Sequence, residues 1–318
     1  MKKIYTCIFS LILFWGTAKT FATTWNEPWA DEVIKKADYF VLADILSSGE
    51  KGAEIKIIKQ FGGETLPSKI KITNFYLLRL GSFSDTDEMG FYFEGANKGY
   101  FFIKKNTKGE YCIATPTTGF DIIEDGNVHA TYRHSYHQAL VPVDIYEMTM
   151  PAIFSRYHGL PFDKKKITDF IDAQISKKPA GFNENEINTF FLQHVAMESI
   201  FHLRLEGYCD KIVPFFNDES NFHNRISAAR ALITCNNDKI KNLLLDKIAS
   251  NKNDDFTTVI CIWALREFKP KELKSRLQSL VKGASTKENG FGGNIMDPRV
   301  GTSFPSVKEA LKDLIDTL

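Results

Sequence analysis

The sequence lacks the short motifs that mark the common enzyme classes. It has no Gly-x-Ser-x-Gly nucleophile turn, no His-Glu-x-x-His zinc motif, no phosphate-binding loop and no dinucleotide-binding fingerprint. Residues 290–293 (Gly-Phe-Gly-Gly) follow no predicted strand, so we interpret them as part of a flexible insertion between helices. These absences leave no specific catalytic class to predict, and we expect no cofactor.

A surplus of charge of either sign is also missing. The 318 residues include 40 Lys and Arg against 39 Asp and Glu, and 37 basic residues remain without the three lysines of residues 1–22. A near-neutral surface offers no long-range attraction to nucleic acid or anionic lipid, so we expect no nucleic-acid partner. The content of 43% hydrophobic and 25% charged residues is typical of a globular protein, and the length favours about two domains.

Long apolar runs are absent after residue 22. Before it, Lys2 and Lys3 precede an apolar stretch at residues 4–16, and Thr20 and Ala22 supply small residues at an expected cleavage point. This order is typical of a secretory signal peptide, whereas a membrane span needs about 20 apolar residues. We therefore predict that residues 1–22 are removed, that the protein is periplasmic or extracellular, and that no integral membrane segment remains.

Residues 38–142 show the pattern of a β domain. Polar and apolar side chains alternate at residues 54–59 and 69–73, which is typical of half-buried strands. Further strands are predicted at residues 91–94, 100–104, 111–115 and 128–132, and turn-like segments separate them. Many short strands with close turns predict a small antiparallel barrel or sandwich.

The first of these strands resemble a known family. Residues 55–63 (Ile-Lys-Ile-Ile-Lys-Gln-Phe-Gly-Gly) and 70–72 (Ile-Lys-Ile), within residues 29–75, are similar to the opening strands of exported netrin modules. That resemblance implies an oligonucleotide-binding-like (OB-like) barrel. The family's N-terminal cysteine is missing here, with Trp25 and Trp29 in that region, so the metalloprotease-inhibitor activity of related domains is not implied.

After residue 142 the apolar residues recur at helical spacing, as at Ile167, Phe170 and Ile171. An Ala-Leu pair at Ala231 recurs 33 residues later at Ala264. Residues 225–232 (Arg-Ile-Ser-Ala-Ala-Arg-Ala-Leu) resemble a HEAT-type helical repeat. The resemblance implies stacked helical hairpins, which bury together a face that one hairpin cannot bury alone.

We therefore expect an α+β protein of two domains, a small OB-like β-barrel or sandwich followed by a short HEAT-like α-solenoid. The expected boundaries are residues 1–22 for the signal peptide, 23–143 for the barrel, 144–182 for a linker with helices and 183–318 for the helical repeats.

Cysteine is scarce, and no Cys-x-x-Cys occurs, which argues against a zinc ribbon or a thioredoxin-type site. Stacked hairpins place the start of one second helix beside the end of the next first helix, where Cys209 and Cys235 lie. The solenoid interpretation therefore predicts a disulfide between them, which an oxidising compartment would preserve. Cys261 is expected to be a buried free thiol, and Cys112 a strand residue.

Three of the seven histidines fall within nine residues, at His129, His134 and His137. Imidazoles are common metal ligands, but no carboxylate or thiolate lies inside the cluster to complete a site, so we expect no bound metal. His194 and His202, eight residues apart on one predicted helix, are too distant to share a metal without other ligands and are expected to be helical histidines.

Tyr132, Arg133 and Tyr136 are interleaved with these histidines and belong to residue types enriched at interaction hot spots. They are the candidate partner contacts. The function expected from the whole pattern is an exported, non-catalytic binding or scaffold protein that engages a protein or peptide. The alternative is a metal-assisted hydrolase that uses the histidine cluster of residues 129–137.

Overall fold

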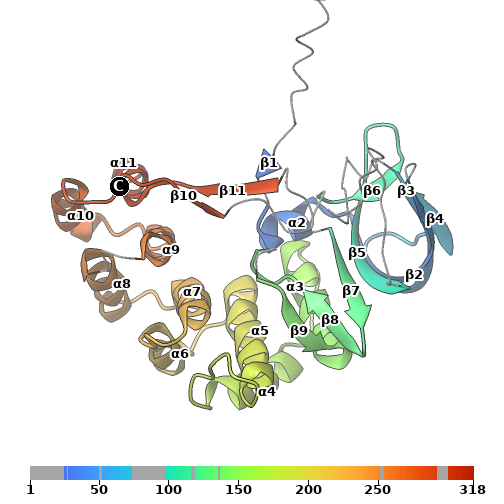
Figure 1. Ribbon diagram of the computed structural model, residues 1–318, viewed down its shortest axis with the longest axis horizontal. Helices are drawn as coiled ribbons and strands as arrows, with labels where there is room; N and C mark the ends of the chain where they lie inside the picture. The colour runs from blue at the N-terminus through green and yellow to red at the C-terminus, as the bar shows by residue number, and fades with distance from the viewer. Residues whose placement is uncertain are drawn as a thin grey trace, which may run out of the picture.

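The computed structural model describes residues 25–26, 28–49, 52–73, 97–115, 119–134, 137–250, 254–291 and 300–318. The fold is of the mixed α+β type, with a β-barrel-like sheet at one side and a curved row of helices at the other (Figure 1). The expected signal peptide, the strand expected at residues 91–94 and Tyr136 lie outside the described residues.

Five strands close into a barrel at the N-terminal side. Their order is β2-β3-β4-β6-β5, and β5 pairs back with β2; β4 and β6 are parallel, and the other pairs are antiparallel. The predicted alternation is confirmed, since Ile55 and Ile70 are buried in the barrel core while Lys56 and Lys69 are exposed. The strands are Tyr39–Gly49 (β2), Gly52–Gly62 (β3), Lys69–Ile72 (β4), Lys98–Lys105 (β5) and Tyr111–Ile113 (β6).

The sheet continues beyond the barrel through strands β7 (Phe120–Glu124), β8 (Asn127–Ala130) and β9 (Ala139–Pro142). Helices α2 (Ala30–Lys36) and α3 (Val143–Tyr157) pack on the outer face of the barrel. Gly62 permits this approach, because a Cβ there would lie 2.2 Å from the Phe154 ring of α3.

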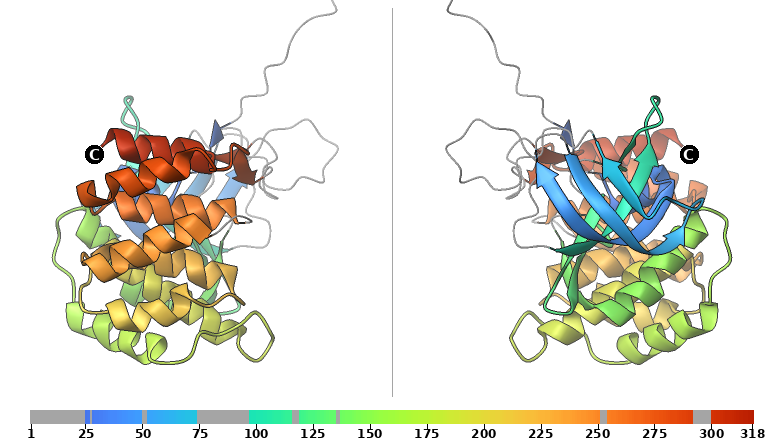
Figure 2. Two further views of the ribbon diagram at one scale, coloured as in Figure 1. Left: turned by 90° about the vertical axis from the view of Figure 1, so that its left-hand side faces the viewer. Right: turned by 90° about the vertical axis from the view of Figure 1, so that its right-hand side faces the viewer.

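The helices after α3 form an arc of two rows (Figures 1 and 2). Helices α5, α7, α9 and α11 form the inner row, and α4, α6, α8 and α10 form the outer row. Ala228 and Ala229 on α7 are fully buried, and such small side chains allow neighbouring helices to approach closely. The bounds are Lys164–Ile175 (α4), Ile187–Leu203 (α5), Cys209–Phe216 (α6), Phe222–Ala231 (α7), Asp238–Ser250 (α8), Asp255–Arg266 (α9), Lys274–Val281 (α10) and Val307–Asp316 (α11), with 3₁₀ turns Leu232–Thr234 (η1) and Lys271–Leu273 (η2).

Within the described ranges, no helix combines the length and the apolar character that crossing a bilayer requires. Helix α4 packs against α5 in the same manner as the later pairs, so the paired arrangement begins at Lys164. The helices pack with the outer side of the barrel in one continuous hydrophobic core, which includes Phe40 in β2 and Leu314 in α11, whereas the barrel interior forms a second core.

Exposed ion pairs link consecutive helices of the outer row. The interhelical pairs are Lys211–Asp172 at 2.5 Å, Lys239–Asp210 at 3.2 Å and Arg276–Asp246 at 3.2 Å. Each exposed pair contributes little to stability. Their consequence is that many charges on the outer side of the arc are satisfied within the chain.

The predicted disulfide between Cys209 and Cys235 is confirmed, with the two Cα atoms 5.7 Å apart. It joins the start of α6 to the residue that follows η1. Cys112 in β6 and Cys261 in α9 are buried free thiols.

Removing this disulfide by the double substitution Cys209→Ala and Cys235→Ala should lower the free energy of unfolding by about 3 kcal/mol. The bond closes a loop with a sequence separation of 26 residues, and its loss frees the unfolded chain to sample more conformations. Urea unfolding of the variant and the parent protein measures the difference. A reductant should shift the parent towards the variant and leave the variant unchanged; equal midpoints for the two proteins would contradict the expectation.

A second, small sheet lies along the open side of the arc. It contains β1 (Trp25–Asn26), β10 (Asn289–Phe291) and β11 (Val300–Phe304), with β1 parallel to β11 (Figure 1). Trp29, just before α2, packs against Trp263 of α9 and Phe304 of β11, with ring centroids 6.0 Å apart in both contacts. The concave side of the arc is therefore covered in part by the chain itself.

Candidate functional site

A group of polar residues lies where residues 131–134 and His137 meet the inner helices α5 and α7. Their side chains are buried or half-buried and are connected by hydrogen bonds, ring contacts and an ion pair. We call this group the junction cluster, and its members are Arg133, His137, His194, Glu198, His223, Ser227 and Arg230.

The three histidines predicted as a cluster do not come together. His129 on β8 contacts Glu124, with 3.0 Å between Nε2 and the carboxylate. His134 lies against Trp29 and hydrogen-bonds Thr302, while His137 stacks on His194. Within the described residues, no group of three or more His, Cys, Asp or Glu side chains has a geometry that could hold a metal ion.

The predicted contact residues Tyr132 and Arg133 are buried. The Tyr132 hydroxyl lies 2.6 Å from the Thr149 hydroxyl, inside the core. The Arg133 guanidinium donates to the His223 carbonyl at 3.2 Å and to Ser227 Oγ at 3.1 Å. Both side chains therefore face the protein interior, and this placement gives no support to a partner contact.

The hydrogen bonds around Ser227 fix the protonation of His194. Ser227 Oγ donates its only proton to Glu198 at 2.8 Å, so it must accept from Arg133 and from Nδ1 of His194, which lies at 2.9 Å. His194 therefore carries its proton on Nδ1. Its Nε2 is an unprotonated, buried nitrogen without a hydrogen-bond partner in the described structure.

This order of donors argues against a serine nucleophile. In a catalytic triad the serine donates to the histidine, and the carboxylate orients the histidine from its other side. Here Ser227 donates to the carboxylate and accepts from the imidazole, so its oxygen is not activated. Glu198 also binds Arg230 at 2.9 Å, which commits the second carboxylate oxygen.

His223 has the opposite tautomer. Its Nδ1 lies 3.3 Å from an Arg133 nitrogen that can only donate, so the proton of the neutral ring lies on Nε2. His137 stands between the two rings, with its centroid 4.1 Å from His194 and 4.6 Å from His223. Neither of its ring nitrogens has a hydrogen-bond partner among the described residues.

Burial keeps these imidazoles neutral. Desolvation, followed by the proximity of the His194 ring and the charge of Arg133, holds the pKa of His137 well below its usual value. Desolvation and then Arg133 do the same for the pKa of His194. Burial lowers the pKa of His202 and of the half-buried His223 to about 4. At neutral pH the charges of the cluster are therefore those of its arginines and Glu198.

A buried carboxyl lies on the sheet side of the same region. Asp121 of β7 accepts from the Tyr146 hydroxyl at 2.5 Å and from the Thr131 backbone N–H at 3.2 Å. Burial outweighs these hydrogen bonds and raises the pKa of Asp121 to about 7. The folded protein therefore holds a proton that the unfolded chain releases near its ordinary pKa of 3.8.

The substitution Asp121→Asn should stabilise the fold relative to the parent by about 2–3 kcal/mol as the pH rises from 5 to 8, because about two pH units separate pH 5 from the folded-state pKa. The stability supplied by the protonated carboxyl is complete at low pH and is lost as the pH rises through the folded-state pKa of about 7. The asparagine avoids that loss. Urea unfolding of both proteins at pH 5 and pH 8 measures it; a difference between them that does not change with pH would contradict the assignment.

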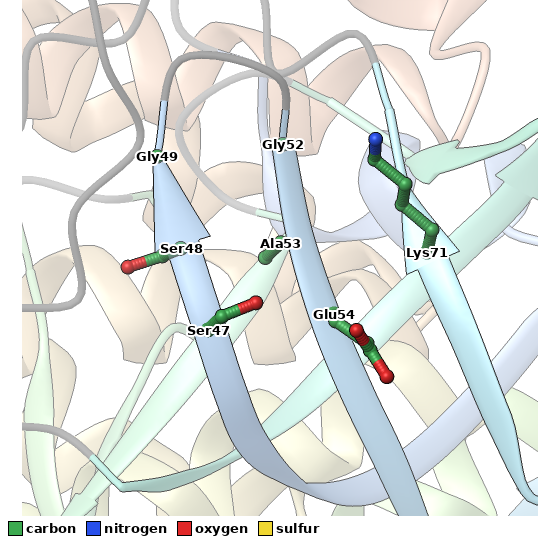
Figure 3. A pocket seen from close by; sticks show the side chains of 7 residues that line it. All are labelled: Ser47, Ser48, Gly49, Gly52, Ala53, Glu54 and Lys71. Atoms are coloured by element: carbon green, nitrogen blue, oxygen red, sulfur yellow. The ribbon is translucent and has the colours of Figure 1, made fainter.

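A shallow groove lies elsewhere, at the end of the β2–β3 hairpin. Its volume is about 440 Å³, and Figure 3 shows the side chains that line it. Glu54 of β3 and Lys71 of β4 occupy opposite positions in the ladder beside it. The lining residues are Ser47, Ser48, Gly49, Gly52, Ala53, Glu54 and Lys71. Hydroxyl, carboxylate and ammonium groups make it suited to polar ligands, with no histidine or thiol in the lining.

The residues that the sequence argument missed are the partners of His137. A signal for them exists in α5, where His194, Glu198 and His202 recur every four residues and so occupy one face of the helix. Three ionisable side chains on one face of a largely apolar helix indicate a buried polar contact. His194 and His202 both lie in helix α5, as expected, and both are buried.

Comparison with known proteins adds no assignment: the chain matches no protein-family model, and no curated protein or solved structure shows significant similarity to it.

Proposed function

We propose that this protein is an exported, non-catalytic binding or scaffold protein and that it engages a protein or peptide partner. The observation that carries the proposal is the commitment of the junction cluster to internal bonds. Arg133, Ser227 and Glu198 are buried, and their hydrogen bonds connect residues 131–134 to helices α5 and α7. Such a network stabilises the junction of sheet and helices and offers no activated nucleophile.

The strand order supports an OB-like barrel. If β2 to β6 are counted one to five, the closed order is one-two-three-five-four, with the third and fifth strands parallel. The inner and outer rows of paired helices likewise support a HEAT-like relationship. OB-fold barrels bind ligands on the face of their second and third strands, which correspond here to β3 and β4.

The surfaces of the molecule differ in how much of each is covered or neutralised by contacts within the protein. The concave side of the arc is partly covered by Trp29 and β11, and its outer side has ion pairs between helices. On the outer face of β3 and β4, Lys56, Lys69 and Lys71 are exposed, and no ion pair with another described residue involves them. We therefore place the proposed interface on this face.

Export is supported by the disulfide between Cys209 and Cys235, since disulfides persist in the periplasm and outside the cell.

The metal-assisted hydrolase receives no support from the geometry, because His129, His134 and His137 occupy separate environments.

Cross-linking in the native host tests the proposal. The parent protein is compared with a variant in which Lys56, Lys69 and Lys71 are replaced by glutamate, and with a control in which the exposed Lys164, Lys178 and Lys312 are replaced instead. Both variants change the net charge equally. The proposal expects a cross-linked partner that the first variant loses and the control retains. A partner bound equally by all three proteins, or stoichiometric zinc lost on substitution of His134, would overturn it.

A further inference from the structure

The register of β3 and β4 determines which backbone groups of β4 are used. The Ile57 N–H donates to the Ser68 carbonyl, so the hydrogen-bonded pairs of this antiparallel ladder recur at every second residue and include Ile55 with Ile70. The backbone N–H and C=O groups of Lys69 and Lys71 therefore point away from β3, towards the other edge of β4.

That other edge is only partly paired. Strand β6 meets β4 at a single position, Ile72 with Tyr111, and the Thr73 N–H donates to the Tyr111 carbonyl. Among the described residues, the N–H and C=O of Lys69 and the N–H of Lys71 have no partner in the ladder. Free N–H and C=O groups at a strand edge are a template on which another extended chain can pair.

The side chains beside this edge define what such a chain would contain. Along β4 the exposed Lys69 and Lys71 alternate with the buried Ile70 and Ile72. Lys56 lies directly opposite Lys69 across the ladder, a like-charge pairing that costs stability, and the exposed Glu54 opposite Lys71 offsets only part of the positive charge of the three lysines. An added strand would place alternate residues beside the lysines and the others beside the apolar core.

We propose that an extended segment of the partner, with alternating acidic and apolar residues, binds as an added strand on the Lys69–Lys71 edge of β4. The inference rests on the proposed binding function and identifies its mode. The acidic side chains would lie beside Lys56, Lys69 and Lys71, and the backbone of the segment would take up the free groups of Lys69 and Lys71.

The first experiment measures binding of a fluorescent peptide to the whole protein. The probe is an eight-residue peptide of alternating Glu and Val, and the control has the same composition with four Glu followed by four Val. The expected result is binding of the alternating peptide at least about tenfold more tightly, weakened by added salt. Equal affinities, or no binding, would overturn the inference; no binding is also the outcome if the lysines serve only to keep other strands away.

A matched pair of variants separates backbone from charge. Lys71→Ala and Lys71→Pro both remove the ammonium group, but only proline removes the outward N–H, which the ladder with β3 does not use. Strand addition predicts that the proline variant binds the alternating peptide at least about fivefold more weakly than the alanine variant. Equal affinities would overturn the inference.

Because the proline variant could fold poorly, methylated probes provide a second test with the parent protein. Successive backbone N–H groups of a strand point to opposite edges, so methylating every Val amide blocks one edge of the peptide and methylating every Glu amide blocks the other. One series should lose binding and the other keep it, and equal behaviour would overturn the inference. The proposed function is tested separately, by whether the Lys56, Lys69 and Lys71 variant loses its cross-linked partner.

Discussion

Acidification from pH 7 to pH 4 should lower the free energy of unfolding by more than about 3 kcal/mol. The pKa of His202 is about 4 in the folded protein, against an ordinary value of 6.5. Between pH 4 and pH 6.5, His202 is therefore protonated in the unfolded chain but neutral in the folded protein. That difference alone corresponds to about 3 kcal/mol, present above pH 6.5 and lost as the pH falls to 4. His137 and His194 act in the same direction.

Burial sets the direction of these pKa shifts, and the charged groups that face the rings modify their size. Arg133 and Arg230 oppose protonation of the imidazoles, whereas Glu198 favours it at His202. Asp121 acts oppositely, because its raised pKa makes it a stabilising group as the pH falls below 7. Urea midpoints at pH 7, 6, 5 and 4 measure the sum.

The matched control for the acid effect is His137→Phe, which keeps a flat ring but removes a titrating group without hydrogen-bond partners among the described residues. Its stability should depend less steeply on pH between 6.5 and 4 than that of the parent. Equal pH dependence in the two proteins, or a parent whose urea midpoint is unchanged at pH 4, would show that the histidines are not held neutral by the fold.

The substitution Glu198→Ala should cost about 3–5 kcal/mol of folding stability. Glu198 is fully buried, accepts from Ser227 at 2.8 Å and pairs with Arg230 at 2.9 Å. Removal of one partner of a buried ion pair leaves the other charge uncompensated in a region of low polarity. Arg133 adds a second positive charge nearby, and it too would lose the balancing carboxylate. Thermal or urea unfolding measures the loss.

A double substitution separates charge compensation from packing. Glu198→Ala combined with Arg230→Met removes both charges and should be less destabilising than the sum of the two single changes. The Arg230 guanidinium also lies 3.8 Å from the Phe201 ring centroid and 4.8 Å from that of Trp29, contacts that methionine partly replaces. Strict additivity would indicate that the Glu198–Arg230 pair contributes only through packing.

Local pattern was sufficient for much of the secondary structure. Alternation at residues 54–59 and 69–73 predicted β3 and β4, because one side of each strand faces a core. The Cys209–Cys235 bond followed from the geometry expected of stacked hairpins. These inferences succeeded because each depends on neighbouring elements or on a repeated packing unit.

The junction cluster was beyond such reasoning, because its members are far apart in the sequence. Arg133 and Ser227 are separated by 94 positions, and Arg133 and His223 by 90. Tyr132 and Arg133 have the composition of an interaction surface, yet the return of the chain onto α5 and α7 buries them. Residue type indicated that the segment makes contacts, but only the three-dimensional arrangement shows that these contacts are internal.

The pairing of β1 with β11 affects the order in which the protein can complete its fold. Trp25 and Asn26 align with Val300 and Gly301, so a backbone ladder joins residues nearly the full chain length apart. A chain that is synthesised from its N-terminus exposes the β1 segment long before its partner is made. Such distant contacts also slow folding, since a long loop must close before they form. Newly made molecules would therefore pass through a period in which the concave side of the arc is uncovered.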